Sequence, residues 1–177
     1  WKRTDTAGYF WKPQTGATPI FQSGPDVDHT LGTASGQYLY TRRLGFSTSN
    51  FSELRSPWID MSTMTAPELE FWYHMFGNSI SDLKVYVTVK GGAKSLEATI
   101  TGQQHTSSVA AWSSKIVDLT AYAGDTIKIS FRGIRTVNGF NTDISIDDVS
   151  VDDAICLDPS NLLVSNIGST TVDVDWT

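Results

Sequence analysis

Two pairs of aspartates are the residues best suited to chemistry in this sequence. Asp26 and Asp28 follow Gly24-Pro25 in a predicted turn, and Asp147 and Asp148 stand side by side in the last predicted strand of the main domain. A carboxylate that is buried without a partner is costly in free energy. Ca²⁺ supplies such a partner, because it prefers several oxygen ligands from carboxylates and carbonyls. These four residues therefore predict a structural calcium site.

The alternation around the second pair predicts an irregular strand. Ile144 and Ile146 point inward with a period of two, which would turn Asp148 inward as well. Val149, however, requires the opposite parity. A β-bulge at Asp147 and Asp148 reconciles the two patterns and re-aims a carboxylate. The alternative interpretation is that the first pair only caps turns and that the tandem pair is solvated.

Four aromatic residues are candidates for a ligand-binding surface. Tyr86 shares its strand parity with Lys84 and Thr88, so we expect its ring on a surface that faces solvent. Phe140 follows a predicted turn at Asn138-Gly139. Exposed rings of this kind can stack on sugars, whereas the alternative is that they pack in the core. The predicted ligand-binding residues are Tyr86, Phe140, Trp58 and Tyr122.

No other combination of residues indicates catalysis or zinc binding. The three histidines lie far apart and lack the H-E-x-x-H spacing. The single cysteine, Cys156, has no accompanying histidine signature, and we expect it to be buried or to pair outside the chain. No G-x-S-x-G motif or phosphate-binding loop occurs. The sequence therefore predicts a module that is not an enzyme, although its parent protein can be a hydrolase.

Composition and charge limit the partners. Of the 177 residues, 40% are hydrophobic and 11% are aromatic, which is enough to build a sizeable core. The net charge is −6 and the sequence contains no Lys/Arg cluster, so we expect no nucleic acid partner. No run approaches the ~18 consecutive apolar residues that a membrane span needs, so we expect no membrane insertion.

Apolar residues recur with a period of two along much of the chain. The clearest runs are residues 69–76, 83–89 and 127–131. Such alternation is typical of half-buried antiparallel strands. Gly91-Gly92 lies between two of the predicted strands and indicates a hairpin turn. We find no long helical stripe, and we therefore predict an all-β protein, an antiparallel jelly-roll β-sandwich.

The composition changes after residue 155. Residues 1–155 are expected to form the main domain, and residues 156–177 a linker and a truncated second domain. Pro159 interrupts the strand pattern, and the alternating tail that follows is too short to bury two faces by itself. The order of Pro159, Asn161-Leu162 and a strand that ends in Trp176 resembles the start of a fibronectin type III domain.

The main domain contains a series of ordered motifs: Trp11, Gly16-Ala17-Thr18-Pro19, Gly24-Pro25-Asp26-Val27-Asp28-His29-Thr30, Gly36-Gln37-Tyr38-Leu39, Leu54-Arg55-Ser56-Pro57, residues 69–77, Trp112 and Ile144-Ser145-Ile146-Asp147-Asp148-Val149. In this order the motifs resemble the MAM family, and the resemblance covers roughly residues 1–155. Animal MAM domains usually carry paired cysteines, so a chain with Cys156 alone looks like a bacterial version, and the family's opening F-E segment is expected upstream of Trp1.

The MAM resemblance implies a function and a location. It implies a non-catalytic extracellular binding or adhesion module, in a secreted or cell-surface multidomain protein, that binds a protein or a glycan or associates with itself. It also implies a structural cation, Ca²⁺, at the acidic residues. The alternative function is a carbohydrate-binding module that targets a parent hydrolase to polysaccharide, and a third is an inert spacer between neighbouring domains.

Overall fold

Strands make up most of the structure, a computed structural model that describes residues 1–4, 8–45, 49–136, 139–154, 163–165 and 173–175. Within these ranges the one helical element is a short 3₁₀ turn, η1. The elements in chain order are β1 (Lys2–Arg3), β2 (Tyr9–Thr15), β3 (Gln37–Arg43), β4 (Phe51–Arg55), β5 (Ile59–Asp60), β6 (Pro67–Met75), β7 (Ile80–Val89), β8 (Lys94–Thr101), β9 (Ser113–Asp118), η1 (Thr120–Tyr122), β10 (Thr126–Arg135), β11 (Ile144–Asp153), β12 (Leu163–Ser165) and β13 (Asp173–Asp175).

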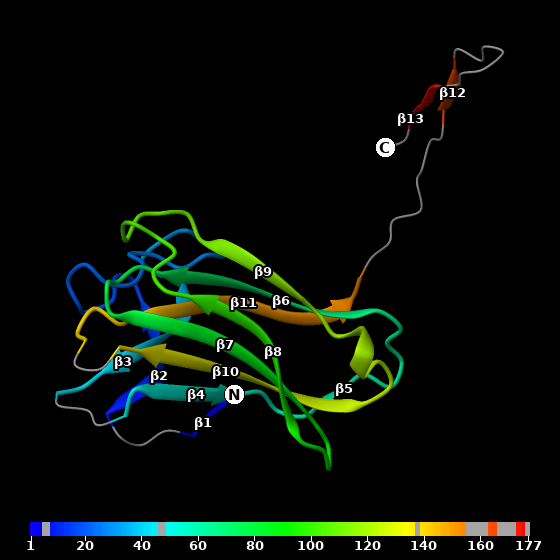
Figure 1. Cartoon of the computed structure of the whole chain (residues 1–177). Coiled ribbons are helices and arrows are strands. Elements are labelled where there is room, and N and C mark those ends of the chain that lie inside the picture. The colour runs from blue at the N-terminus through cyan, green and yellow to red at the C-terminus, as the bar shows by residue number, and fades with distance from the viewer. Residues whose placement is uncertain (5–7, 46–48, 137–138, 155–162, 166–172, 176–177) are drawn as a thin grey trace.

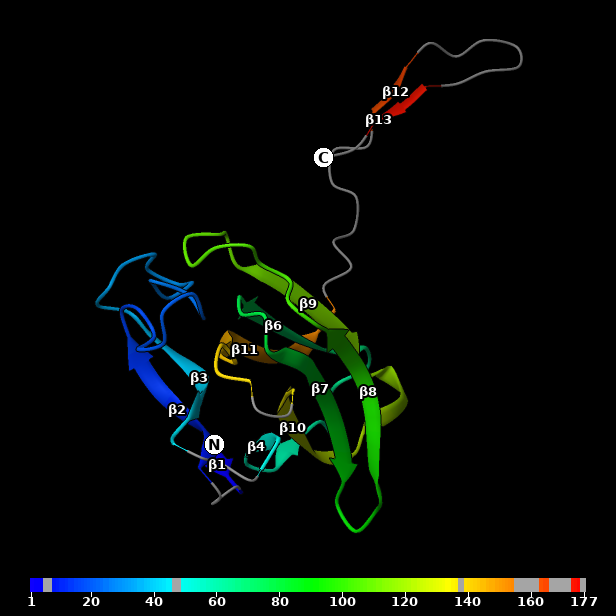
Figure 2. The ribbon, with the colours of Figure 1, turned by 60° about the vertical axis from the view of Figure 1, so that its left-hand side comes forward.

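Two antiparallel sheets pack face to face to form the main body (Figures 1 and 2). The first sheet has the strand order β1-β4-β10-β7-β8, with β5 also paired to β10. The second sheet has the order β2-β3-β11-β6-β9. In both sheets, strands that are distant in sequence lie side by side, as β4 and β10 do. The predicted fold class, an all-β antiparallel jelly-roll β-sandwich, is confirmed.

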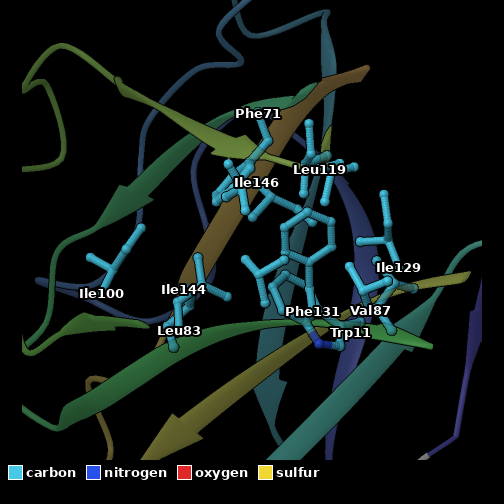
Figure 3. Packing of buried hydrophobic residues seen from close by; sticks show 14 of the residues in the cluster. Trp11, Phe71, Leu83, Val87, Ile100, Leu119, Ile129, Phe131, Ile144 and Ile146 are labelled. Atoms are coloured by element: carbon cyan, nitrogen blue, oxygen red, sulfur yellow. The ribbon is translucent and has the colours of Figure 1, made fainter. Parts of the chain in front are cut away.

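Apolar side chains from both sheets fill the space between them (Figure 3). Phe131 of β10 and Phe71 of β6 meet edge to face, with ring centroids 4.9 Å apart. Both rings are fully buried, and so is Leu83 of β7. Burial of each such side chain contributes about 1.5–3 kcal/mol to folding. Because this core holds the two sheets together, their outer faces are left for other contacts.

The predicted alternation is confirmed along β7. Val85 and Val87 are fully buried, whereas Tyr86 between them is half-buried on the opposite face. The predicted hairpin after this strand is confirmed as well. The Gly92 N–H donates to the Val89 carbonyl at 2.8 Å, and Gly91 has φ of 82°, a conformation that glycine adopts without steric cost.

The predicted bulge in β11 is also confirmed. The register between β11 and β6 shifts between Asp147 and Ser150, and Asp148 has φ of 44°. This backbone region is uncommon for residues other than glycine, although aspartate tolerates it better than most. The bulge lets Ile144 and Ile146 stay in the core while Asp148 is exposed.

At the carboxyl end, β12 pairs with β13 in a two-stranded antiparallel sheet. The proposed boundary at residue 155 and Cys156 lie outside the described residues. Most of the segment that resembles a fibronectin type III domain lies outside them too, so that assignment stays a prediction.

Candidate functional site

The structure brings together three of the four predicted metal ligands, Asp28, Asp147 and Asp148, around His29 and Thr30. The His29 N–H donates to Asp147 Oδ2 at 2.9 Å. His29 Nδ1 lies 2.6 Å from Asp148 Oδ2, and the Thr30 hydroxyl donates to Asp148 Oδ1 at 2.5 Å. Residues more than a hundred positions apart therefore meet at this end of the sandwich, as the sequence analysis expects.

Asp28 caps the turn in which it lies. Its carboxylate is almost fully buried and accepts the Leu31 N–H at 2.8 Å and the Thr33 N–H at 3.1 Å. A Cβ at Gly36 would lie 1.9 Å from Asp28 Cγ, so only glycine fits beside it. Asp26 points elsewhere, because it accepts a hydrogen bond from Ser108 Oγ at 3.1 Å.

Hydrogen bonds already satisfy these carboxylates. Burial raises the pKa of Asp147, and the nearby charges of Asp148 and Asp28 raise it further, while backbone N–H groups oppose the shift. Burial also raises the pKa of Asp148, but hydrogen bonds from Thr30 and His29 outweigh it and lower the pKa overall. No group of three His, Cys, Asp or Glu side chains in the described part of the chain is placed to hold a metal ion. The turn-capping alternative thus fits Asp28, while Asp147 and Asp148 bind His29 and Thr30 rather than being left to solvent, and the calcium site stays a prediction.

A second buried layer lies on the outer face of the second sheet. Ser145 of β11 pairs with Tyr40 of β3 on one side and with His74 of β6 on the other, and all three are fully buried. Loops close over this row. Trp112 Nε1, for example, donates to the Val27 carbonyl at 3.2 Å. This end of the second sheet is therefore buried on both faces.

Among the residues that the structure describes, several buried polar atoms of this layer make no hydrogen bond of good geometry. They include the Tyr40 hydroxyl, both ring nitrogens of His74 and both carboxylate oxygens of Asp143. Burial, helped by the neighbouring His105 ring at 4.3 Å, lowers the pKa of His74 to about 3. Burial raises the pKa of Asp143 to about 7. The layer thus favours the neutral form of both groups. Asp143 is a residue that the sequence analysis missed, since nothing in its local pattern marks it as buried.

The outer face of the first sheet has a different character, with aromatic and basic side chains open to solvent. Strand register assembles it, since Ser130 of β10 pairs with Arg55 of β4 and with Tyr86 of β7, and Thr88 pairs with Lys128 and Lys94. The sequence contains no Lys/Arg cluster, yet the fold creates one from separate strands. We call this surface the basic aromatic face, formed by Phe51, Glu53, Arg55, Trp58, Lys84, Tyr86, Lys94, Lys128 and Arg132.

Glu53 lies at the centre of the basic aromatic face and is 2% exposed. Arg55 Nε donates to it at 2.7 Å, Lys94 Nζ at 2.6 Å and Arg132 Nη2 at 2.8 Å. Burial by itself raises the pKa of Glu53, but the hydrogen bonds from these three cations outweigh it and lower the pKa to about 2. One carboxylate therefore holds three cationic side chains in place.

The cations of this face also lie over aromatic rings. Lys94 Nζ is 4.3 Å from the centre of the Tyr86 ring, and Lys128 Nζ is 4.3 Å from that of Trp58. Arg132 lies between the rings of Tyr86 and Phe51, at 5.0 Å and 4.8 Å. Beside them is an open pocket of about 330 Å³, lined by Arg55, Trp58, Thr88, Gly92, Lys94, Lys128 and Ser130.

The four predicted ligand-binding aromatics do not form one surface. Trp58 and Tyr86 belong to the basic aromatic face, and Trp58 is 44% exposed. Tyr122 packs against the core and donates its hydroxyl to Glu97. Phe140 is exposed and follows the C-terminal end of β10. Trp58 lies next to β5, which pairs with the N-terminal end of β10. Because β10 spans the sandwich, Phe140 and Trp58 lie at opposite ends of it.

Replacing Glu53 with glutamine is expected to lower the free energy of unfolding by about 2 kcal/mol at pH 7. The variant keeps the size of the side chain but leaves three neighbouring cations without a counter-charge. Partial exposure of those cations keeps the loss below that of a fully buried pair. Urea unfolding measures it, with Glu68→Gln as a control on a strand carboxylate outside this cluster. Equal losses in the two variants would contradict the role of Glu53.

These features define a β-sandwich domain with a tightly filled core and one outer face that is open to solvent. The sequence matches the model of the family described as MAM domain, meprin/A5/mu, over residues 1–157, and the chain belongs to this family. MAM domains are adhesion-type modules of extracellular proteins. That this chain is a bacterial version of the family stays a prediction.

The chain is similar to parts of larger vertebrate proteins. Neuropilin-1a of Danio rerio is 35% identical over 104 residues, which are 57% of this chain and 11% of that protein. MAM domain-containing glycosylphosphatidylinositol anchor protein 2 of Homo sapiens is 31% identical over 168 residues, which are 86% of this chain and 16% of that protein. The chain therefore spans less than a fifth of the length of these relatives.

The solved structures that share the fold include the following two. The K1 cleaved adhesin domain of Lys-gingipain from Porphyromonas gingivalis W83 has a TM-score of 0.58 at 21% identity, over 87% of this chain and 90% of that one. A carbohydrate-binding module from the β-sandwich superfamily has a TM-score of 0.50 at 11% identity, over 84% of this chain and 58% of that one. At these identities the likeness shows the fold alone. Among the described residues no helix is long and apolar enough to cross a membrane.

Proposed function

We propose that this chain is a non-catalytic binding module of a secreted or cell-surface protein, and that it binds an extracellular protein or glycan on its basic aromatic face. The observation that carries the proposal is the pocket on that face, where Trp58, Lys94 and Lys128 meet. Aromatic and arginine side chains are the groups that most often dominate binding energy at such surfaces.

Three features support this location over the rest of the molecule. The core between the sheets is filled, and the outer face of the second sheet is closed by loops at its Tyr40–His74 end. The basic aromatic face, by contrast, keeps Trp58 and Phe51 more than 40% exposed. Its side chains are held by Glu53 and by cation–π contacts, so little side-chain entropy is lost when a ligand binds.

Replacing Trp58 with alanine is expected to weaken ligand binding about 30-fold, which corresponds to the roughly 2 kcal/mol lost when an interface anchor is truncated. Glycan arrays and cell-surface protein pull-downs first identify ligands, and titration calorimetry then compares the variants. Phe140→Ala is the matched control, because that exposed ring lies at the other end of the sandwich. A ligand lost with Phe140→Ala but kept with Trp58→Ala would place the site elsewhere.

The same experiment separates the two kinds of ligand that the proposal includes. Retention of a polysaccharide supports the carbohydrate-binding alternative. Retention of a protein, or dimerisation that depends on concentration and is lost with Trp58→Ala, supports adhesion. If the module binds no ligand at all, it acts as a spacer, and the proposal is wrong.

A further inference from the structure

Charge is distributed unevenly over this molecule. The chain as a whole has a net charge of −6, yet cations outnumber carboxylates on the basic aromatic face. Glu53 is shared by three cations, and Asp82 lies 3.8 Å from Lys84. A cluster of one sign on a protein of the opposite net charge creates a local potential that attracts counter-charged ligands.

The cations of this face are only partly neutralised. Within the described residues, no carboxylate lies at ion-pair distance from Lys128, which lies over Trp58 instead. Burial lowers the pKa of the Lys94 ammonium, and the charges of Arg132 and Arg55 lower it further, while Glu53 opposes the shift. Within the described residues Arg55 hydrogen-bonds to Glu53 through Nε, and its terminal nitrogens can donate to an incoming acceptor. An incoming anion would relieve this crowding.

The pocket beside these cations suits a sugar better than a peptide. Besides Lys94 and Lys128 it is lined by the Trp58 ring and by Thr88 and Ser130, which carry hydroxyl groups. An exposed indole offers a flat apolar surface to a sugar ring, and hydroxyl groups can exchange hydrogen bonds with it. An extended peptide binds most readily at a free strand edge. Here the floor of the pocket, at Thr88, Lys128 and Ser130, lies over β7 and β10, which are paired on both sides, and the edge strand β8 contributes Lys94 at its rim.

On the basis of the function proposed above, we propose that the basic aromatic face binds an acidic polysaccharide. The carboxylate or sulfate groups of the polymer pair with Lys128, Lys94 and Arg55, and a sugar ring stacks on Trp58. The ligand class is thus a glycan that carries negative charge along its chain. Neutral glycans lack the anionic groups that would pair with these cations, and acidic peptides lack the sugar ring that would stack on the Trp58 indole.

The test uses polymers that share one backbone. Dextran, carboxymethyl-dextran and dextran sulfate are immobilised, and poly-L-glutamate serves as the acidic peptide. We expect the chain to bind the two charged dextrans but neither dextran nor poly-L-glutamate. Binding should weaken at 0.5 M NaCl, because the Debye length is then about 3–5 Å and salt screens the attraction between exposed charges that lie farther apart.

Matched variants assign the binding to this face. Lys128→Glu is expected to weaken binding to carboxymethyl-dextran at least about tenfold, and it leaves the Glu53 cluster intact. Lys115→Glu, on β9 of the second sheet, makes the same change of charge away from the face and is expected to bind like the wild type. Circular dichroism verifies that each variant is folded. Equal loss in both variants would show attraction to net charge alone and would overturn the inference.

Other outcomes separate this inference from the proposed function. Suppose that dextran and its charged forms bind equally, and that this binding is lost with Trp58→Ala but not with Lys128→Glu. The inference that the ligand is acidic is then wrong, while the proposed function stands. Binding of poly-L-glutamate as tight as that of carboxymethyl-dextran overturns the glycan class. Absence of binding to any charged dextran also overturns the inference, and the proposed function then depends on the separate Trp58→Ala comparison.

Discussion

Replacing Asp143 with asparagine is expected to raise the free energy of unfolding at pH 8 by on the order of 4 kcal/mol. Asp143 is fully buried, and within the described part of the chain neither carboxylate oxygen accepts a hydrogen bond of good geometry, although the Thr18 and Ser23 hydroxyls lie nearby. Thr18 donates its hydroxyl to the Ser23 carbonyl, and Ser23 Oγ accepts the Asp143 N–H at 2.9 Å. The two hydroxyl groups lower the pKa of Asp143, but burial raises it by more. An ionised carboxylate in this place is therefore poorly compensated.

The sign of the effect follows from the pKa of Asp143, which burial raises from 3.8 to about 7. Between pH 3.8 and about 7, Asp143 is protonated in the folded state but ionised in the unfolded state. The stability contributed by the neutral acid is complete below pH 3.8 and is lost as the pH rises through 7. Asparagine carries no charge, so the variant escapes this loss.

Urea unfolding at pH 4.5, 6 and 8 measures the effect. The advantage of Asp143→Asn over the wild type should grow with pH and reach its plateau above pH 7. Asp152→Asn is the control, since Asp152 is exposed on the same strand, β11, and surface substitutions usually change stability by less than about 0.5 kcal/mol. A variant no more stable than the wild type at pH 8 would show that the Asp143 carboxylate has a compensating partner.

The second large effect is expected at His74 in acid. Burial and the neighbouring His105 lower the pKa of His74 from 6.5 to about 3, while the backbone of Ser107 and Ala110 opposes the shift. Between pH 3 and 6.5, His74 is protonated in the unfolded state but neutral in the folded state. The wild type therefore loses on the order of 4 kcal/mol from this group as the pH falls from 6.5 to 3. His74→Phe keeps a flat ring against His105 but has no group to titrate at this position, so this loss should be absent from the variant.

The measurement compares the two proteins by urea unfolding at pH 7.5, 5.5 and 4. Their stabilities should differ little at pH 7.5, where both rings are neutral, and the variant should become the more stable one as the pH falls. A parallel decline of the two proteins would contradict the prediction, because it would mean that His74 titrates equally in the folded and unfolded states.

The effects at Asp143 and His74 have opposite signs and overlap between about pH 4 and 6.5. The wild-type stability is therefore expected to vary little in that window, since the gain from neutral Asp143 on acidification offsets the loss at His74. Each single variant should show the pH dependence of stability that comes from the group that remains. Asp143→Asn should steepen the loss of stability in acid, and His74→Phe should leave a stability that falls as the pH rises toward 7.

The fold could be predicted from the sequence because its main signal is local. A period of two along β7 and β10 places alternate side chains on opposite faces of any strand, whatever its partners are. The conflict of parity around Asp147 predicted the bulge in β11 for the same reason. The ordered motifs also indicated the family, which the match over residues 1–157 confirms.

The predicted site residues had a mixed outcome. Asp26, Asp28, Asp147 and Asp148 were predicted to form one site; the structure brings Asp28, Asp147 and Asp148 together, whereas Asp26 contacts Ser108 instead. The sequence could not show that backbone N–H groups of the same loops would satisfy those carboxylates. Among the aromatics, parity placed Tyr86 on an open face, but Tyr122 and Phe140 lie apart from it, because the ends of strands and loops carry no periodic signal.

By itself, then, the sequence determined the class of fold, the inward and outward faces of the long strands, and the family. The tertiary structure alone decided which outer face is closed and which is open. The Glu53 cluster joins residues 41 and 79 positions apart, and the layer around Asp143 depends on Ser23, 120 positions away. Such contacts arise from strand register and from loops that fold over a sheet. Neither leaves a local pattern, because each depends on segments that meet only in the folded chain.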